Sequence, residues 1–301
     1  VEFPLWLTVF TIQRQKSFTL CSLFGLKQNT RHKYKTKGSE ATTCSDKFTS
    51  VSDSTADIFQ SVPGQSCSAN HSNRKSVILR EGSGKVISIN KSRRIKHVDG
   101  IKIITGSRDC TTLDLSNLSL NGLSPDIGSL TELVELFLYE NKLVSLPSQI
   151  CKLRKLQKLW LQENCLLSLP VELGLCTKLI HLDLRHNRLE GPLPAAITRL
   201  LSLTQLFLTY NKLNDISGIG RLTKLQTLVV KSNNLQGRIS DCIGQLTDLK
   251  TLDLSKNRLT EIPDEISGCK HLIRFLVDYN HILQIPTSLG ELTELQILGI
   301  K

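Results

Sequence analysis

Two histidines flanking an aspartate are the residues in this chain that most suggest chemistry. His181, Asp183 and His186 could supply metal ligands or an acid–base pair. Their alternation with Leu182 and Leu184 predicts a strand whose polar side chains face an open sheet. An open sheet provides no desolvated pocket in which a pKa could be tuned for catalysis. We therefore interpret these residues as the lining of a recognition surface, and we predict no metal site.

A second candidate for chemistry is the segment GSGK at residues 82–85, which is similar to part of a phosphate-binding loop. The complete motif needs a glycine at position 79 and a serine or threonine at position 86, where Leu79 and Val86 stand. The chain also lacks a nucleophile elbow, a paired-cysteine zinc motif and a kinase signature. We therefore expect a protein that is not an enzyme, with no cofactor and no small-molecule substrate.

The cysteines favour free thiols. There are nine, an odd number, with irregular spacing and no C-x-x-C pair. This usage predicts a reducing compartment, and we expect a cytoplasmic protein, with the nucleus as the alternative. Three Asn-x-Ser triplets, at Asn70, Asn90 and Asn117, favour secretion instead.

An internal repeat determines the elements that position the candidate residues. The unit reads L-x-x-L-x-L-x-x-N-x-L-x-x-L-P-x-x-I-x-x-L-x-x, and consecutive copies begin 22 to 24 residues apart. The copies begin at Cys110, Leu133, Leu156, Leu179, Leu203, Leu225, Leu249, Leu272 and Leu295. This unit is the leucine-rich repeat. It predicts an α/β solenoid, a horseshoe with a parallel sheet on its concave face.

Each position of the unit has a physical role. The L-x-L step has a period of two, which indicates a short strand with inward leucines. A leucine–proline or isoleucine–proline step turns the chain toward the opposite side. The asparagine in the ninth position can bond to backbone groups at the bend, and it recurs as a structural ladder: Asn141, Asn164, Asn187, Asn211, Asn233, Asn257 and Asn280. The first copy has Leu118 in that place.

Three repeats depart from the common length. Residues 187–194 (NRLEGPLP) and 233–240 (NNLQGRIS) carry one extra residue and a glycine, whereas the repeat containing residues 211–220 (NKLNDISGIG) is one residue short. We expect these changes to alter the curvature locally. The ninth copy stops at Lys301, within its strand, so we expect the native array to continue.

The formal charge of +11 divides unevenly along the chain. Residues 1–109 contain 18 basic and 8 acidic side chains, whereas residues 110–301 contain 20 and 19. We therefore predict no nucleic-acid binding by the repeats. The apolar opening at residues 1–12 is too short to span a bilayer, so no stable membrane insertion is expected.

Composition and repeats together predict three parts. Residues 1–84 form a disordered, basic, Ser/Thr-rich extension. Residues 85–109 form an N-terminal capping or linker segment with a short strand or two, and residues 110–301 form the repeat domain. That domain has eight full repeats plus the start of a ninth.

The outward positions of the predicted sheet contain large aromatic side chains beside charged groups, a composition typical of protein-binding surfaces. The alternative is that the aromatic rings pack on one another across neighbouring strands. The predicted partner-binding residues are Phe137, Tyr139, Glu140, Trp160, Asp183, Arg185, His186, Phe207, Tyr210, Lys231 and Tyr279.

The order of several motifs resembles one leucine-rich repeat family. ELVELFLYENKLVSLP (132–147), QENCLLSLP (162–170), LDLRHNRL (182–189) and RLLSLTQLFLTYNKL (199–213) are similar to the early repeats of the SHOC/SUR scaffolds. The resemblance covers residues 110–215 well and the later repeats only generically.

The resemblance implies a cytoplasmic adaptor that joins a Ras-type GTPase to the catalytic subunit of protein phosphatase one and promotes Raf/MAP kinase signalling. It carries Tyr139, Asp183, Arg185, His186 and Phe207 over as contact residues. The glycine-containing repeats are more similar to those of plant receptors, so a second interpretation stays open. In it, the chain is a fragment containing the recognition domain of a larger receptor or kinase.

Overall fold

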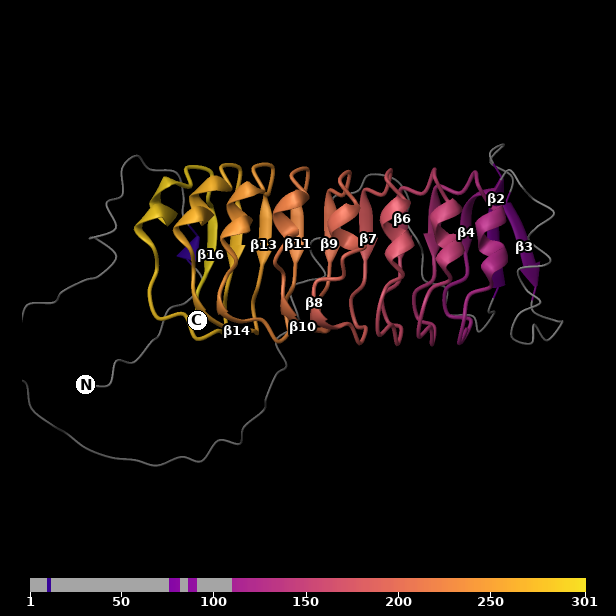
Figure 1. The fold of residues 1–301 in the computed structure, drawn as a ribbon, viewed down its shortest axis with the longest axis horizontal. Helices are drawn as coiled ribbons and strands as arrows, with labels where there is room; N and C mark the ends of the chain where they lie inside the picture. The colour runs from indigo at the N-terminus through magenta and orange to yellow at the C-terminus, as the bar shows by residue number, and fades with distance from the viewer. Residues whose placement is uncertain (1–9, 12–75, 82–85, 91–109) are drawn as a thin grey trace, which may run out of the picture. The chain divides into compact units, whose positions relative to one another are not determined.

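The computed structural model describes residues 10–11, 76–81, 86–90 and 110–301. Each repeat contributes one short strand to a single sheet, and Figure 1 shows these strands side by side in chain order. The parallel strands are β4 (Cys110–Asp114), β5 (Glu135–Phe137), β6 (Lys158–Trp160), β7 (His181–Asp183), β9 (Gln205–Phe207), β11 (Thr227–Val229), β13 (Thr251–Asp253), β15 (Arg274–Leu276) and β16 (Ile297–Gly299). The predicted parallel sheet and solenoid are confirmed.

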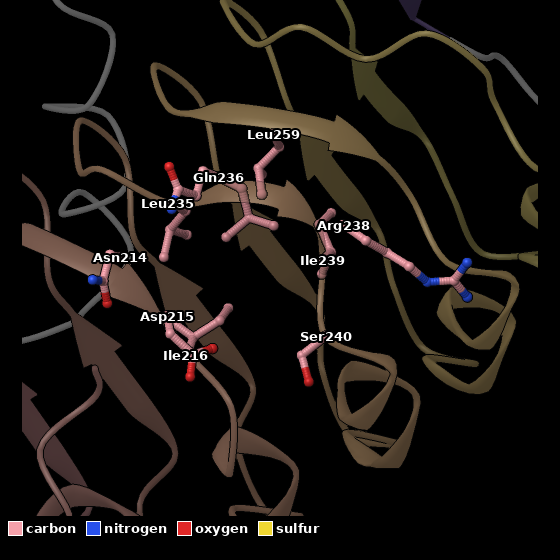
Figure 2. A pocket seen from close by; sticks show the side chains of 10 residues that line it. Asn214, Asp215, Ile216, Leu235, Gln236, Arg238, Ile239, Ser240 and Leu259 are labelled. Atoms are coloured by element: carbon pink, nitrogen blue, oxygen red, sulfur yellow. The ribbon is translucent and has the colours of Figure 1, made fainter. Parts of the chain in front are cut away.

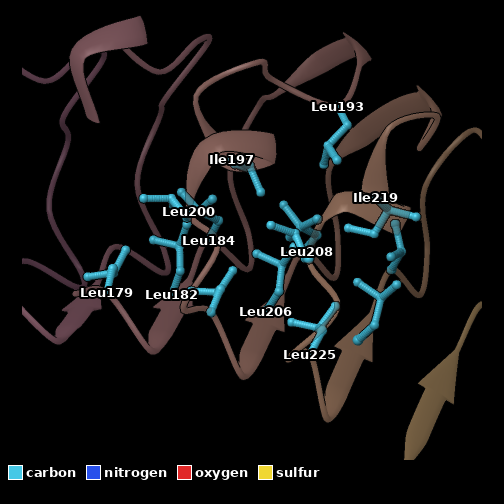
Figure 3. Close-up of a cluster of buried hydrophobic side chains, with 14 of the residues drawn as sticks. Leu179, Leu182, Leu184, Leu193, Ile197, Leu200, Leu206, Leu208, Ile219 and Leu225 are labelled. Carbon is cyan, nitrogen blue, oxygen red and sulfur yellow. The ribbon is translucent and has the colours of Figure 1, made fainter. Parts of the chain in front are cut away.

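The strands pair in the same register at every step. Leu136 lies beside Leu159, and Leu159 lies beside Leu182, so the middle residue of each strand points inward. These leucines are fully buried and form one continuous hydrophobic core along the repeats. Figure 3 shows part of that core, with leucines of the strands facing Ile197 and Leu200 of the opposite layer.

The layer opposite the sheet consists of 3₁₀ turns, and residues 110–301 contain no α-helix. Proline precedes four of these turns, at Pro147, Pro170, Pro263 and Pro286, with φ between −63° and −74°. The turns are η3 (Pro125–Ser129), η4 (Ser148–Lys152), η5 (Val171–Leu175), η6 (Ile197–Arg199), η7 (Ile219–Arg221), η8 (Asp241–Gln245), η9 (Asp264–Gly268) and η10 (Thr287–Glu291).

The ninth-position asparagines join neighbouring repeats. The Nδ2 group of Asn164 donates to the carbonyl of Leu161 at 3.0 Å and to the carbonyl of Leu138, in the preceding repeat, at 2.9 Å. Its Oδ1 atom accepts from the backbone N–H of Leu143, also in the preceding repeat, at 3.0 Å. The other members of the ladder, at 141, 187, 211, 233, 257 and 280, make equivalent bonds.

The residue before each ladder asparagine adopts a left-handed conformation. Tyr210 has a φ of 55° and Tyr279 a φ of 56°, although neither is glycine. The N–H group of Tyr210 donates to the carbonyl of Lys231, in the next repeat, at 3.1 Å. This bond helps to offset the strain, and the conformation turns the following asparagine into the coil.

The glycine-containing repeats form two additional parallel pairs away from the main sheet. In the first, β8 (Glu190–Pro192) pairs with β10 (Lys212–Asp215), and in the second, β12 (Gln236–Arg238) pairs with β14 (Arg258–Glu261). Gly191 has a φ of 80° and Gly237 a φ of 69°, which explains glycine at both turns. The effect of these repeats on curvature stays a prediction.

Strands from outside the repeats pair with both ends of the sheet. β2 (Ser76–Glu81) and β3 (Val86–Asn90) form an antiparallel pair, and β2 is also antiparallel to β4. β1 (Phe10–Thr11) is antiparallel to β16. β2 begins at Ser76, before the predicted boundary at residue 85. The predicted boundary falls too late in the chain because composition does not reveal the pairing of β2 with β4.

The remaining expectations for the N-terminal part fall on residues that the structure does not describe. These are the rest of the basic extension, the GSGK segment at 82–85, and the linker at 91–109. The six cysteines between 110 and 301 are all free thiols. None of the helices among the described residues is long and apolar enough to cross a membrane.

We predict that Asn233→Ala lowers the free energy of unfolding by about 1–3 kcal/mol, because its backbone partners lose their hydrogen bonds inside the coil. The matched control is Asn234→Ala, at the exposed neighbouring position, with an expected change below about 0.5 kcal/mol. Denaturant unfolding followed by circular dichroism measures both. Equal losses in the two variants would show that the ladder amide is not a special contact.

Candidate recognition surface on the sheet

The outward side chains of four neighbouring strands form a continuous row of rings. We call Phe137, Trp160, His181 and Phe207 the aromatic row. The rings of Phe137 and Trp160 are stacked, with centroids 4.0 Å apart and planes 7° apart. His181 lies 5.0 Å from Trp160 and 5.5 Å from Phe207 between ring centroids. The row thus crosses β5, β6, β7 and β9 without a break.

The register of the sheet produces this row. Neighbouring strands lie about 4.8 Å apart, so outward side chains at matching positions must touch. Phe137 and Trp160 are opposed directly, and both are half-buried. Tyr139 adds an edge-on contact to Phe137, with centroids 6.4 Å apart. These contacts hold a rigid apolar surface in place before any partner arrives.

Ion pairs within the sheet neutralise the charges beside the row. Lys158 pairs with Glu135 at 3.0 Å, and the Lys158 Nζ atom lies 5.9 Å from the Trp160 ring centroid. Arg185 Nη2 lies 2.7 Å from Asp183 Oδ2, and its Nε atom also bonds to both carboxylate oxygens. The apolar rings are therefore bordered by paired charges.

Two of the predicted contact residues are not exposed. Asp183 is completely buried, because Arg185 covers its carboxylate and the Arg185 backbone N–H donates to it at 3.1 Å. Phe207 is only 6% exposed, with the guanidinium carbon of Arg185 lying 5.6 Å from its ring centroid. The expectation that both side chains are exposed is wrong, and for Phe207 the stated alternative applies, because its ring packs against His181 of the neighbouring strand. Asp253 makes the same local turn, accepting from the backbone N–H of Ser255 at 2.9 Å.

The other predicted residues lie along the bend where the chain leaves the sheet. Glu140, His186, Tyr210 and Tyr279 are exposed and occupy the left-handed position before the ladder asparagine. The rings of His186 and Tyr210 are stacked at 4.5 Å. Lys231 is half-buried and lies one residue before the left-handed position of its repeat, which Ser232 occupies. The predicted set therefore divides among the aromatic row, three residues beside it (Tyr139, Asp183 and Arg185) and this bend.

His181 has a more specific environment than the sequence indicated. Its Nδ1 atom lies 2.8 Å from Gln205 Oε1, whereas its buried Nε2 atom has no hydrogen-bond partner. Burial lowers the pKa of His181 from the ordinary value of 6.5, and the Gln205 hydrogen bond and the Asp183 charge oppose that shift. The imidazole is therefore held neutral between two aromatic rings. In the sheet register His181 lies opposite Lys158 and Gln205. Aligning the repeats in the sequence shows this pairing and could have predicted the hydrogen bond between His181 and Gln205.

Other kinds of site find little support among the described residues. None of their His, Cys, Asp and Glu side chains gather in threes as a metal site. Figure 2 shows a small pocket, with a cavity volume of about 30 Å³, lined by residues of β10 and β12. A shallower hollow lies on the opposite layer, beside Asp241 and Glu265. Neither adjoins the aromatic row.

We predict that the protein loses stability as pH falls below about 6.5, with a contribution from His181. The unfolded imidazole binds a proton there, while the folded one, with its lowered pKa, stays neutral, so protonation favours unfolding. Chemical denaturation at pH 7.5 and pH 5.5 tests this, with both pH values chosen to bracket roughly pH 6.5. His181→Gln should reduce the difference between the two pH values. The exposed control His281→Gln should leave it unchanged, and an equal effect of both variants would contradict the assignment.

Comparison with known proteins agrees with this architecture. The family model described as leucine rich repeat matches residues 154–213, 177–235 and 223–282. A search of the curated proteins finds no match.

Three solved structures are similar to the chain. A leucine-rich repeat protein of Leptospira interrogans is 32% identical, with a TM-score of 0.55, over 66% of this chain and 56% of that one. The ectodomain of the receptor kinase GASSHO1/SCHENGEN3 of Arabidopsis thaliana, in complex with CASPARIAN STRIP INTEGRITY FACTOR 2, is 30% identical. Its TM-score is 0.54, over 65% of this chain and 27% of that one. A TDR receptor is 27% identical, with a TM-score of 0.57, over 66% of this chain and 35% of that one.

The chain thus spans just over half of the Leptospira protein and about a quarter to a third of the two receptors. The matched segments overlap along consecutive coils, and the strands of those coils pair in one register. Residues 110–301 therefore have the leucine-rich repeat fold, and residues 154–282 match the family model.

Proposed function

We propose that this domain binds a partner protein through the aromatic row on its sheet face. The observation that carries the proposal is the stacked, half-buried pair of Phe137 and Trp160, which two ion pairs border. Large rigid aromatic side chains in a low-charge setting provide most of the binding energy in many interfaces. The pair is fixed by its neighbours, so binding does not have to pay for ordering it.

The shape of the surface favours a protein over a small molecule. Small ligands need concave pockets that enclose most of their surface, whereas the aromatic row lies on an open sheet. The similar Arabidopsis ectodomain was solved in complex with CASPARIAN STRIP INTEGRITY FACTOR 2. An open, preformed row of rings is suited to recognition rather than to catalysis, which supports a role without enzymatic activity.

For the identity of the partner, we propose a Ras-type GTPase together with the catalytic subunit of protein phosphatase one. The support is the resemblance of the early repeats to the SHOC/SUR scaffolds, since LYENKL, LDLRHN and TQLFL occur here in that order. One member of the aromatic row, Phe207, lies within these motifs, and Phe137 and His181 directly precede two of them. In this role the protein acts in the cytoplasm as an adaptor for Raf/MAP kinase signalling.

A second candidate has its own observation. The turns at Gly191 and Gly237 form additional strand pairs, and the similar structures include a plant membrane receptor kinase and a TDR receptor. These features support a recognition domain of a larger receptor or kinase. Its ligand would use the same sheet face.

We predict that the full chain retains a GTP-loaded Ras-type protein and the phosphatase catalytic subunit in one complex. Trp160→Ala should weaken retention about tenfold or more, because it removes the centre of the row. The control is Leu201→Ala, an exposed apolar residue on the opposite layer, and circular dichroism verifies folding of both variants.

The outcomes separate the parts of the proposal. Retention that Trp160→Ala leaves unchanged would show that the partners bind elsewhere. A chain that retains neither protein would exclude the adaptor and leave the receptor-type candidate.

A further inference from the structure

Cationic side chains gather at the bend where the later repeats leave the sheet. The residues on both sides of each ladder asparagine lie at the surface, because the asparagine between them turns into the coil. Five of these flanking residues are exposed lysines or arginines: Lys142 in the second repeat and, in the later repeats, Arg188, Lys212, Lys256 and Arg258. We call the four in the later repeats the rim cations.

The rim cations differ from the charges beside the aromatic row because none of them forms an ion pair within residues 110–301. Lys158 and Arg185 are paired with carboxylates, as is Arg238 on the far side of the bend. Among residues 110–301, no carboxylate oxygen lies within 4.0 Å of a rim cation. Lys212 is opposite Glu190 in the β8–β10 pair without forming an ion pair with it. The rim therefore presents unneutralised positive charge.

Two exposed tyrosines lie among these cations. Tyr210, 40% exposed, is stacked on His186, and Tyr279, 61% exposed, lies with its ring centroid 5.9 Å from Lys256 Nζ. Tyrosine beside arginine and lysine is a common composition of binding surfaces, because the ring supplies area and the hydroxyl supplies a hydrogen-bond donor.

The spacing of the rim suits an extended chain. Neighbouring coils lie about 4.8 Å apart, so Arg188 and Arg258, which are three coils apart, are separated by roughly 15 Å. An extended segment covers that distance in about five residues, with side chains on one side repeating every 7 Å or so. Acidic side chains at such intervals can reach successive rim cations.

The sign of the charge changes along the bend. In the second and third repeats the exposed residues before the ladder asparagine are Glu140 and Glu163, and one cation, Lys142, follows Asn141. The four rim cations all lie in the later repeats. A bound segment with its acidic part over the later repeats avoids this carboxylate pair, so the charge pattern sets its direction.

The chain's own N-terminal part does not fit this surface by charge. Residues 1–109 as a whole have ten more basic than acidic side chains, so this part taken together is not complementary to the rim cations, although residues 40–57 contain four acidic side chains and one basic. An acidic segment of another protein is complementary to it.

We infer that the rim cations bind an extended acidic segment of the partner protein, next to the part that contacts the aromatic row. This inference rests on the proposed function, since one partner supplies both parts. It adds the chemical class of the segment and its direction along the repeats.

Fluorescence anisotropy on the full chain tests the inference with two labelled peptides, one of alternating Glu and Ser and one of alternating Gln and Ser. The Glu peptide should bind more tightly, and its affinity should fall as salt screens the charges. The triple variant Arg188→Gln, Lys212→Gln, Arg258→Gln should weaken Glu-peptide binding about tenfold, since each exposed ion pair contributes a few-fold.

The matched control removes the same charge at positions away from the bend, with Lys152→Gln in η4 and Lys178→Gln and Lys224→Gln in the turns after η5 and η7, all exposed. It should bind the Glu peptide as tightly as the unchanged protein. Equal weakening in both triple variants would show a general charge effect, and undiminished binding in the rim variant would place the peptide on the basic N-terminal part. Either result overturns the inference, as does equal affinity for the two peptides. If folding of the triple variant fails, Lys212→Gln and Arg258→Gln are measured singly, each with an expected few-fold loss.

Two further arms keep the alternatives separate. Trp160→Ala should leave Glu-peptide binding unchanged. If this variant loses partner retention but still binds the Glu peptide, the loss tests the aromatic row and not the rim cations. The second arm measures a single-stranded oligonucleotide. If the triple rim variant binds the oligonucleotide more weakly but binds the Glu peptide as tightly as the unchanged protein, the rim binds nucleic acid and the inference is overturned.

Discussion

The bend at the end of each strand has backbone groups that must find hydrogen-bond partners away from water, and the rest of the structure depends on this constraint. The ladder asparagine satisfies it by bonding to carbonyls of its own coil and of the preceding coil. Its amide oxygen accepts from a backbone N–H of that preceding coil as well. These bonds hold each coil in a fixed register with its neighbour. That register places each outward residue beside its counterpart in the next coil.

The binding surface follows from that alignment. Because strands in register bring matching positions into contact, Phe137 and Trp160 stack, and His181 fills the space between Trp160 and Phe207. The same alignment allows Lys158 and Arg185 to be neutralised beside the rings. At the bend the flanking residues are directed away from the coil, and the cations of the later repeats form no ion pair there within residues 110–301. One network of hydrogen bonds between the coils thus positions both the aromatic row and the rim cations.

The regular features of the fold could be predicted from the sequence, because they depend on positions within one repeat. The L-x-L step indicates the strand, and the repeat spacing indicates parallel stacking in order. Features that depend on which side chains become neighbours could not be predicted from one repeat. Asp183 is buried because Arg185 turns back over it, and Phe207 is buried among side chains of other strands. Likewise, β2 is a short apolar stretch that follows a polar segment, and its pairing with both β3 and β4 could not be predicted from composition.

The central claim is that the binding face is preformed by the stacked coils, and hydrogen–deuterium exchange on the free chain tests it most directly. The backbone N–H groups of Leu143, Leu166 and Leu189 donate to ladder asparagines, so segments containing them should exchange far more slowly than an unfolded chain. Slow exchange across residues 135–213 without any partner is the predicted result. Exchange at unfolded-chain rates in these segments would contradict the account, because the aromatic row would then have to form on binding.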